Sequence, residues 1–179
     1  VSFAVSKKSH FKEAFGVANS LTYLDEFDEF DIDDIKNINN KILNKLIFGI
    51  THVEYKYFNN KFYLIEAAAR GGGTKVSSHI VPIVSGYDVN ELLIDTAIGK
   101  EVKFEKTLYN NQCAILKFFS FEGGVVKKII GTEIKKINNN ILELELEFKV
   151  GDFLSKPTDD RGRVGYFIAY SDNVEKLDK

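Results

Sequence analysis

Residues 49–73 of this 179-residue chain read GITHVEYKYFNNKFYLIEAAARGGG. The pattern predicts two strands, at 50–57 and 62–69, because β-branched and aromatic residues dominate both runs. A short turn at Asn59-Asn60 would join them. A run of three glycines then follows the second strand. We expect an antiparallel hairpin that ends in a sharp backbone turn.

Side chains two positions apart share one face of a strand. Glu54 and Glu66 therefore lie side by side only if the pairing register brings them opposite each other. A two-residue turn would place Glu54 opposite Ile65, whereas a three-residue loop or a bulge would place it opposite Glu66. Two facing carboxylates favour a bound cation, and Mg²⁺ takes one or two carboxylates together with phosphate oxygens and water. Arg70, two positions beyond Ala68, offers a planar fork for a phosphate or an oxyanion.

Four segments carry a resemblance: residues 49–54, 63–72, 85–88 and 97–99. Together they look like the closing half of an ATP-grasp domain, the fold that uses ATP to join a carboxylate to an amine. In that family two Glu residues on neighbouring strands hold Mg²⁺, and the second opens an E-x-N-x-R pattern whose Arg contacts the reaction intermediate. The resemblance implies that Glu54 and Glu66 bind metal and the bound ATP, and that Arg70 is catalytic.

The sequence departs from the family pattern at one position, and the resemblance assigns no firm role to several nearby residues. Ala68 stands where the family most often has Asn, which weakens the metal assignment without removing it. His52 lies beside the first metal ligand and has no firm role. Gly72 and Gly73 are possible neighbours of an amino-acid substrate, although a tight strand exit is the simpler interpretation of the glycine run. His79 is expected to be a packed core residue.

The rest of the chain completes an α+β pattern. A strand is expected at residues 1–6, a loop-like stretch to Tyr23, and an amphipathic helix at about 31–48 with Asp31 as N-cap and Gly49 at its end. Helical patterns follow near 77–84 and at 88–98, where Asp88 caps the second and Gly99 closes it. Two further strands, at 113–121 and 125–130, are expected to form a hairpin about Glu122-Gly123-Gly124. A strand at 141–150 is expected to have one solvent-exposed face. A last strand at 165–170 would precede a short polar helix.

We place a boundary near Lys100. Residues 1–100 would be the C-terminal half of an ATP-grasp domain, with an antiparallel sheet and helices. Residues 101–179 resemble the small β-rich domain that closes L-amino-acid ligases, on the strength of residues 123–131, 149–151, 161–166 and 171–173. The chain opens as if a strand were already under way, so we interpret it as a fragment; by the resemblance, the glycine loop, lysines and hinge that bind nucleotide precede it, and it is expected to be inactive alone.

Composition limits the alternatives. The formal net charge of −2 gives no sign of nucleic-acid binding, and no apolar run is long enough to cross a membrane. The single cysteine, Cys113, is expected to be a buried structural thiol, which fits a cytoplasmic setting. The partners would be a small-molecule carboxylate and an amine, with ATP and Mg²⁺ (or Mn²⁺) as cofactors. A homodimer is one option for the assembly.

Three functions stay open from the sequence. The first is an ATP-dependent carboxylate–amine ligase that acts through an acyl phosphate, most consistent with amino acids as substrates. The second is bicarbonate activation, as in biotin carboxylase or carbamoyl-phosphate synthase. The third is a non-catalytic scaffold, which the alanine at position 68 keeps in consideration.

Overall fold

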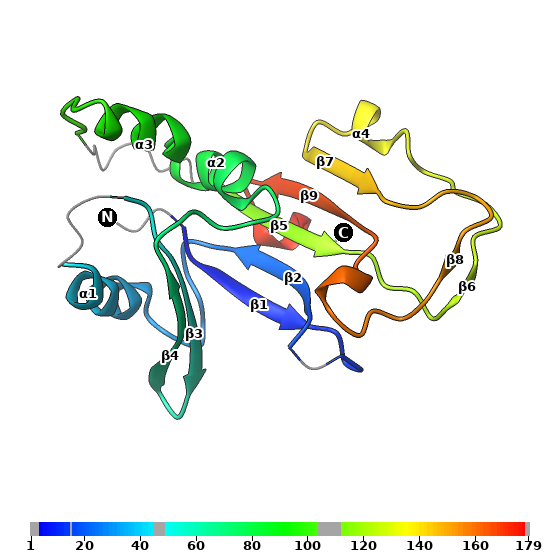
Figure 1. Ribbon diagram of the computed structural model, residues 1–179, viewed down its shortest axis with the longest axis horizontal. Coiled ribbons are helices and arrows are strands. Elements are labelled where there is room, and N and C mark those ends of the chain that lie inside the picture. Colours follow the sequence, from blue (N-terminus) through cyan, green and yellow to red (C-terminus); the bar gives the residue numbers. More distant parts are fainter. Residues whose placement is uncertain (1–3, 15, 45–48, 104–111, 178–179) are drawn as a thin grey trace. The chain divides into compact units, whose positions relative to one another are not determined.

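The computed structural model describes residues 4–14, 16–44, 49–103 and 112–177. These residues form two compact units (Figure 1): one holds residues 24–103 with residues 4 and 5, and the other holds residues 6–23 and 112–177. The mixture of antiparallel sheets and short helices confirms the predicted α+β class. The domain boundary predicted near Lys100 stays a prediction, because the two units are defined by compactness alone. No helix among the described residues is long and apolar enough to span a membrane.

The second unit is built on a five-stranded antiparallel sheet. Its strands, in spatial order, are β1 (Ser6–His10), β2 (Ala18–Tyr23), β5 (Cys113–Phe118), β9 (Gly165–Ser171) and β7 (Ile141–Leu146). The prediction of a loop-like stretch up to Tyr23 is therefore wrong, because this stretch forms the paired strands β1 and β2. Residues 1–3 of the strand expected at 1–6 lie outside the described part, and β1 begins only at Ser6.

The core of this unit follows its central strands. Ala114, Leu116 and Ile168 are fully buried, and five of the six residues of β5 are buried on alternating faces. A near-continuous apolar strand of this kind is typical of a position covered on both sides. Cys113 is buried as well, and its Sγ donates to the Ser171 carbonyl at 3.1 Å. The prediction of a structural thiol is confirmed.

Shorter elements complete the second unit. They are β6 (Gly124–Val125), α4 (Ile134–Ile137), β8 (Phe153–Leu154) and the 3₁₀ turns η3 (Asp160–Gly162) and η4 (Val174–Lys176). The hairpin predicted about Glu122-Gly123-Gly124 is wrong, because β6 pairs with β8 and not with β5. Strand β7 also ends at Leu146, before the predicted end at residue 150.

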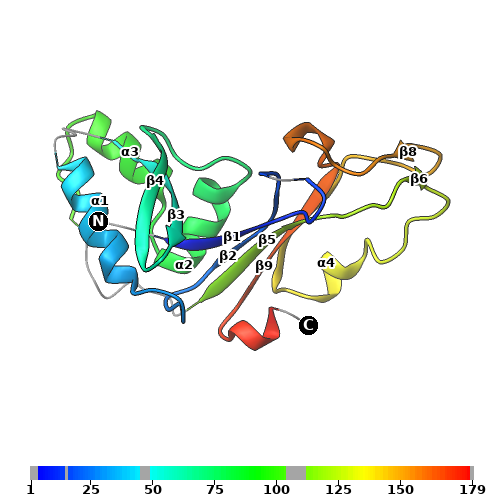
Figure 2. The same cartoon turned by 90° about the horizontal axis from the view of Figure 1, so that it is seen from below.

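The first unit contains a helix, a hairpin and a helical segment. Its elements are α1 (Ile32–Leu43), β3 (His52–Phe58), β4 (Lys61–Ala68), the π-helix η1 (Val76–Ile80), α2 (Val81–Ser85) and α3 (Val89–Ala97). Helix α1 lies beside the β3–β4 hairpin in both Figure 1 and Figure 2. The Tyr55 hydroxyl of β3 donates to the Asn39 Oδ1 of α1 at 2.6 Å, which ties the helix to the hairpin.

Helix ends in this unit follow their capping residues. The carboxylates of Asp31 and Asp88 accept hydrogen bonds from backbone N–H groups in the first turns of α1 and α3, as predicted. Gly99, with φ of 80°, closes α3 through a bond to the Thr96 carbonyl. The predicted end of the first helix at Gly49 is wrong, because α1 ends at Leu43 with Asn44 as its C-cap.

A buried tyrosine joins two strands of the second unit. Tyr166 of β9 is 6% exposed, and its hydroxyl donates to Oε2 of Glu145, its partner on β7, at 2.6 Å. Burial raises the pKa of Tyr166 well above its usual value, and the hydrogen bond to Glu145 raises it further. Glu145 is itself exposed, as predicted for the solvent-exposed face of β7, so the hydrogen bond is only partly buried.

The raised pKa predicts alkaline sensitivity. Between the unfolded pKa of about 10 and the higher folded value, the native state retains a Tyr166 proton that the unfolded state has lost, so stability falls as pH rises. We expect Tyr166→Phe to remove up to about 1.4 kcal/mol per pH unit from this slope. Urea unfolding of both proteins from pH 8 to 11 would measure it. Equal slopes in the two proteins would contradict the assignment.

Candidate functional site

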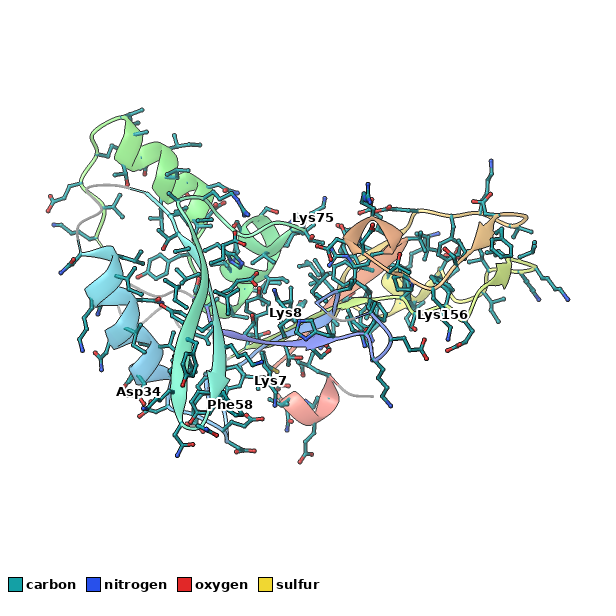
Figure 3. All side chains as sticks on the ribbon, turned by 60° about the horizontal axis from the view of Figure 1, so that its bottom comes forward. Lys7, Lys8, Asp34, Phe58, Lys75 and Lys156 are labelled. Carbon is teal, nitrogen blue, oxygen red and sulfur yellow. The ribbon has the colours of Figure 1, made fainter. Side chains whose placement is uncertain are left out.

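The β3–β4 hairpin closes through a two-residue turn. Asn59 and Asn60 have φ values of 49° and 56°, and Phe58 pairs directly with Lys61. Asparagine tolerates this left-handed conformation, and a turn with two such residues matches the twist of paired strands. Phe58 lies at the turn end of the hairpin in Figure 3. The predicted turn position is thus confirmed.

Aromatic side chains stabilise one face of the hairpin. The rings of Tyr57 and Phe62, which are directly paired, lie 4.8 Å apart. Phe30, from the segment before α1, contacts both rings at 5.4 and 5.2 Å. Tilted and edge-on ring pairs at these distances are favourable packing arrangements. This face therefore holds the hairpin together, and the opposite face remains available for polar side chains.

The register changes once along the hairpin. From the turn, pairing is regular as far as Tyr55 with Leu64; the next pair is Glu54 with Glu66, so Ile65 is left without a cross-strand partner in the ladder. This is a β-bulge, in which one extra residue shifts every later pair by one position. Of the arrangements that could bring the two carboxylates together, the structure has the bulge. Glu54 and Glu66 lie directly opposite each other.

Directly opposed residues have Cβ atoms about 4.5–5.5 Å apart, so the two carboxylates share one small region. Glu54 is 32% exposed and Glu66 is 53% exposed. Each carboxylate also has a basic neighbour: Nε2 of His52 lies 3.3 Å from Oε1 of Glu54, and Nη2 of Arg70 lies 3.6 Å from Oε1 of Glu66. The predicted site residues on the hairpin and Arg70 are therefore brought together on one face.

The exposed guanidinium of Arg70 is held at the end of β4. Its Nη1 donates to the Gly71 carbonyl at 3.0 Å while Nη2 faces Glu66. The guanidinium thus makes one hydrogen bond to the backbone and one ion pair with Glu66. An exposed ion pair of this kind adds little to stability, so its geometry matters here for the site and not for folding.

The glycine run makes the sharp strand exit that the sequence predicted. A Cβ at Gly71 would clash with the Ser77 side chain, and a Cβ at Gly72 would lie 2.9 Å from Cγ1 of Val76. The Ser77 hydroxyl also donates to the Gly72 carbonyl at 3.2 Å. Gly73 is different, because an added Cβ there would meet nothing within 4 Å. Packing accounts for the first two glycines, and only Gly73 offers open backbone.

The two residues that follow the glycine run have strained backbone. Thr74 and Lys75 both have positive φ, 46° and 62°, which is uncommon for residues with a side chain and unusual for a β-branched one. The π-helix η1 begins directly afterwards. Backbone of this kind is found disproportionately at functional sites. No feature of the sequence pattern signalled the strain at Thr74, since threonine favours extended backbone.

His79, predicted to be packed in the core, is only half-buried. Its Nδ1 lies 2.8 Å from the Ser78 hydroxyl. The buried residues of this segment are instead Val76, Ile80 and Val81. The π-helical turn changes the spacing of side chains from the 3.6-residue period on which the prediction relied.

The donor set limits which metal could bind. Among the described residues, no group of three or more histidine, cysteine, aspartate or glutamate side chains is arranged to hold a metal ion. Ala68 lies opposite His52 and cannot ligate. The two facing carboxylates fit Mg²⁺, which takes few protein ligands and fills its shell with phosphate oxygens and water, and they do not fit an all-protein cage.

The chain was compared with protein-family models, curated protein sequences and solved structures. Residues 117–179 match the family model "L-amino acid ligase C-terminal domain 2". The structure resembles L-amino acid ligase from Bacillus licheniformis with a TM-score of 0.78 and 19% identity, over 98% of this chain and 46% of that one. No curated protein sequence matches the chain.

Two further solved structures share the fold. Phosphoribosylglycinamide synthetase from Anaerococcus prevotii has a TM-score of 0.74 and 17% identity, over 97% of this chain and 45% of that one. A biotin carboxylase–β-γ-ATP complex from Campylobacter jejuni has a TM-score of 0.59 and 16% identity, over 89% and 36%. The chain spans less than half the length of each of these proteins.

These comparisons confirm the predicted resemblance. The chain has the fold of the C-terminal part of an ATP-grasp enzyme. Its last 63 residues are similar to the second C-terminal domain of L-amino acid ligases.

The bulge generates a direct test of the register. In a regular ladder closed by the Asn59-Asn60 turn, deleting Ile65 would move Glu66 into the position opposite Glu54. We therefore expect the deletion variant to keep the two glutamates paired on a straightened hairpin. Cross-strand NMR contacts between the backbones of residues 54 and 66 would measure this. Pairing of Glu54 with Ala67 in the variant would contradict the assigned bulge.

Proposed function

We propose that the chain is part of an ATP-dependent ligase that joins a carboxylate to an amine through an acyl phosphate, with amino acids as substrates. The observation that carries the proposal is the bulge-dependent pairing of Glu54 with Glu66, beside Arg70. The match of residues 117–179 to an L-amino acid ligase domain supports the choice of substrate class.

Glu54 and Glu66 are the residues that would hold Mg²⁺, each through a carboxylate on the same face of the hairpin. When bound, Mg²⁺ would neutralise charge on the phosphate oxygens of ATP. The two carboxylates would fix the position of the ion relative to the phosphates, because both side chains project from paired positions on the β3–β4 hairpin. The protein's contribution in such phosphoryl transfers is positioning and electrostatic stabilisation.

Arg70 would stabilise the negative charge that develops as the substrate carboxylate is phosphorylated and then attacked by the amine. Its planar fork can hold two oxygens at once, which a lysine cannot reproduce. The contacts to Glu66 and the Gly71 carbonyl orient the guanidinium before substrate arrives. Gly73, where the backbone is open, would lie near the amino-acid substrate.

The fold also allows bicarbonate activation, since a biotin carboxylase is among the similar structures. The two chemistries differ in the acceptor of the phosphoryl group and can be separated by the co-substrate. The chain spans less than half of the similar proteins. The proposal assigns the further nucleotide contacts to parts of the intact protein outside these 179 residues. We expect the 179 residues alone to release no ADP.

The first test measures ADP release by the full-length protein with ATP, Mg²⁺ and pooled amino acids. We expect release that requires amino acids and is lost in Glu66→Gln, since the amide removes one of the two metal-binding charges. Glu101→Gln, which changes an exposed carboxylate outside the hairpin, is the matched control and should retain the wild-type rate.

Two other outcomes would contradict the proposal. Release that requires bicarbonate instead of amino acids would show the carboxylase type of chemistry. An absence of release under every condition, with folded protein that binds no Mg²⁺, would show a scaffold that has the fold without the reaction.

Arg70 provides the second test. We expect Arg70→Ala to lower kcat by about 10²–10³-fold, the scale for loss of one anion-stabilising donor. Arg70→Lys should recover only part of the rate, because the charge returns without the fork. The matched control is Arg161→Ala, which removes a 91% exposed arginine of the second unit. An unchanged kcat in Arg70→Ala would exclude this residue from the mechanism.

A further inference from the structure

His52 lies between two parts of the candidate site. It opens β3 two positions before Glu54, and both side chains share one face of the strand. Its Nε2 lies 3.3 Å from Oε1 of Glu54. Since a carboxylate only accepts hydrogen bonds at neutral pH, the contact requires the imidazole to donate from Nε2.

The other ring nitrogen faces the glycine turn. A Cβ built on Gly72 would lie 3.3 Å from Nδ1 of His52 and 2.9 Å from Cγ1 of Val76. The ring therefore occupies space that any larger residue at position 72 would take. The backbone at Gly72 is itself held by the Ser77 hydroxyl, which donates to the Gly72 carbonyl. The edge of the imidazole that carries Nδ1 thus faces Gly72.

The cross-strand neighbour leaves room for this arrangement. His52 pairs with Ala68 on β4, whose methyl group is the smallest side chain that a residue with a Cβ can present. The imidazole is 31% exposed, so it is screened from solvent by the turn and the hairpin although it is not buried. Its position is set by the strand, by Gly72 and by the Glu54 carboxylate together.

We propose that His52 is a positioning residue that orients the Glu54 carboxylate for the metal. The inference rests on the proposed function, because it assigns His52 a role towards the metal that Glu54 and Glu66 would hold. Glutamate has three rotatable side-chain bonds, and a side chain without an orienting contact loses this freedom on binding an ion. The hydrogen bond from His52 restricts the Glu54 carboxylate before the ion arrives.

Hydrogen-bonding partners of metal ligands typically change metal affinity by 10–100-fold when they are removed. Two substitutions separate the hydrogen bond from the bulk of the ring. His52→Leu fills much of the same space and donates nothing. His52→Gln places an amide N–H₂ near the position of Nε2, so it can still donate to Glu54.

The experiment titrates Mn²⁺ into the full-length protein, once alone and once with saturating ADP to supply phosphate oxygens, and follows free Mn²⁺ by electron paramagnetic resonance. We expect the dissociation constant to rise about tenfold in His52→Leu and to stay within about threefold of wild type in His52→Gln. His79→Leu, which removes the other half-buried histidine of this unit, is the matched control and should bind as wild type. Thermal unfolding without metal checks that each variant is folded.

A kinetic readout separates positioning from general damage. The Mg²⁺ concentration for half-maximal ADP release should rise in His52→Leu, while kcat at saturating Mg²⁺ changes less than about twofold, since a high ion concentration offsets the lost orientation. A merely structural role would lower kcat and the unfolding temperature together without this split.

The outcomes distinguish the two proposals. Equal Mn²⁺ affinity in wild type and His52→Leu would overturn the role of His52 and leave the ligase proposal intact. Equal weakening in His52→Leu and His52→Gln would also overturn it, because the hydrogen bond would then not be the cause. Absence of Mn²⁺ binding in the wild-type protein both alone and with ADP would overturn the proposed metal site and this inference with it.

Discussion

The register of the β3–β4 hairpin is the constraint on which the candidate site depends. Side chains alternate between the two faces of a strand, so a shift of one residue moves a whole set of side chains to the other face. The Asn59-Asn60 turn alone would set Glu54 opposite Ile65. The single extra residue at Ile65 corrects the pairing and brings Glu54 opposite Glu66. Ile65 itself is 64% exposed.

The hairpin also separates stability from chemistry. Its packed face carries Tyr55, Tyr57 and Phe62, which contact one another and the residues in and before α1. The polar side chains of the site project from the other face. We therefore expect substitutions at the candidate site to preserve the aromatic packing. Separate faces allow two like charges to be held close together, because the energy that fixes the backbone comes from contacts that do not involve them.

Local signals made much of the first unit predictable. The caps Asp31 and Asp88, the Asn59-Asn60 turn and the alternatives for the register all depend on residues near in sequence. The structure has both caps and the turn and, of the register alternatives, the bulge. Pairing between distant segments was not predictable in the same way. β6 pairs with β8 almost thirty residues later, and β1, which reads Ser-Lys-Lys-Ser-His, has no apolar alternation and is a strand because it pairs at the sheet edge. The proximity of His52 to Gly72 was likewise not predictable. Strand spacing alone places His52 beside Glu54, but only the folded chain brings the glycine turn to the other edge of the imidazole.

Ala68 is the position at which the chain departs from the E-x-N-x-R pattern, and it weakens the assignment of Glu54 and Glu66 as metal ligands. The pairing register places Ala68 on the same face as the two glutamates. An asparagine there would add a further polar side chain to the face that carries Glu54 and Glu66, directly opposite His52. With alanine, the hairpin offers two carboxylates and an imidazole that is already engaged with one of them. A transition metal would need further nitrogen or sulfur ligands, which the described residues do not supply at this site. Mg²⁺ needs no such set, because phosphate oxygens and water complete its octahedron. The small donor set therefore favours an ion that arrives with a phosphate ligand over one that is held by the protein alone.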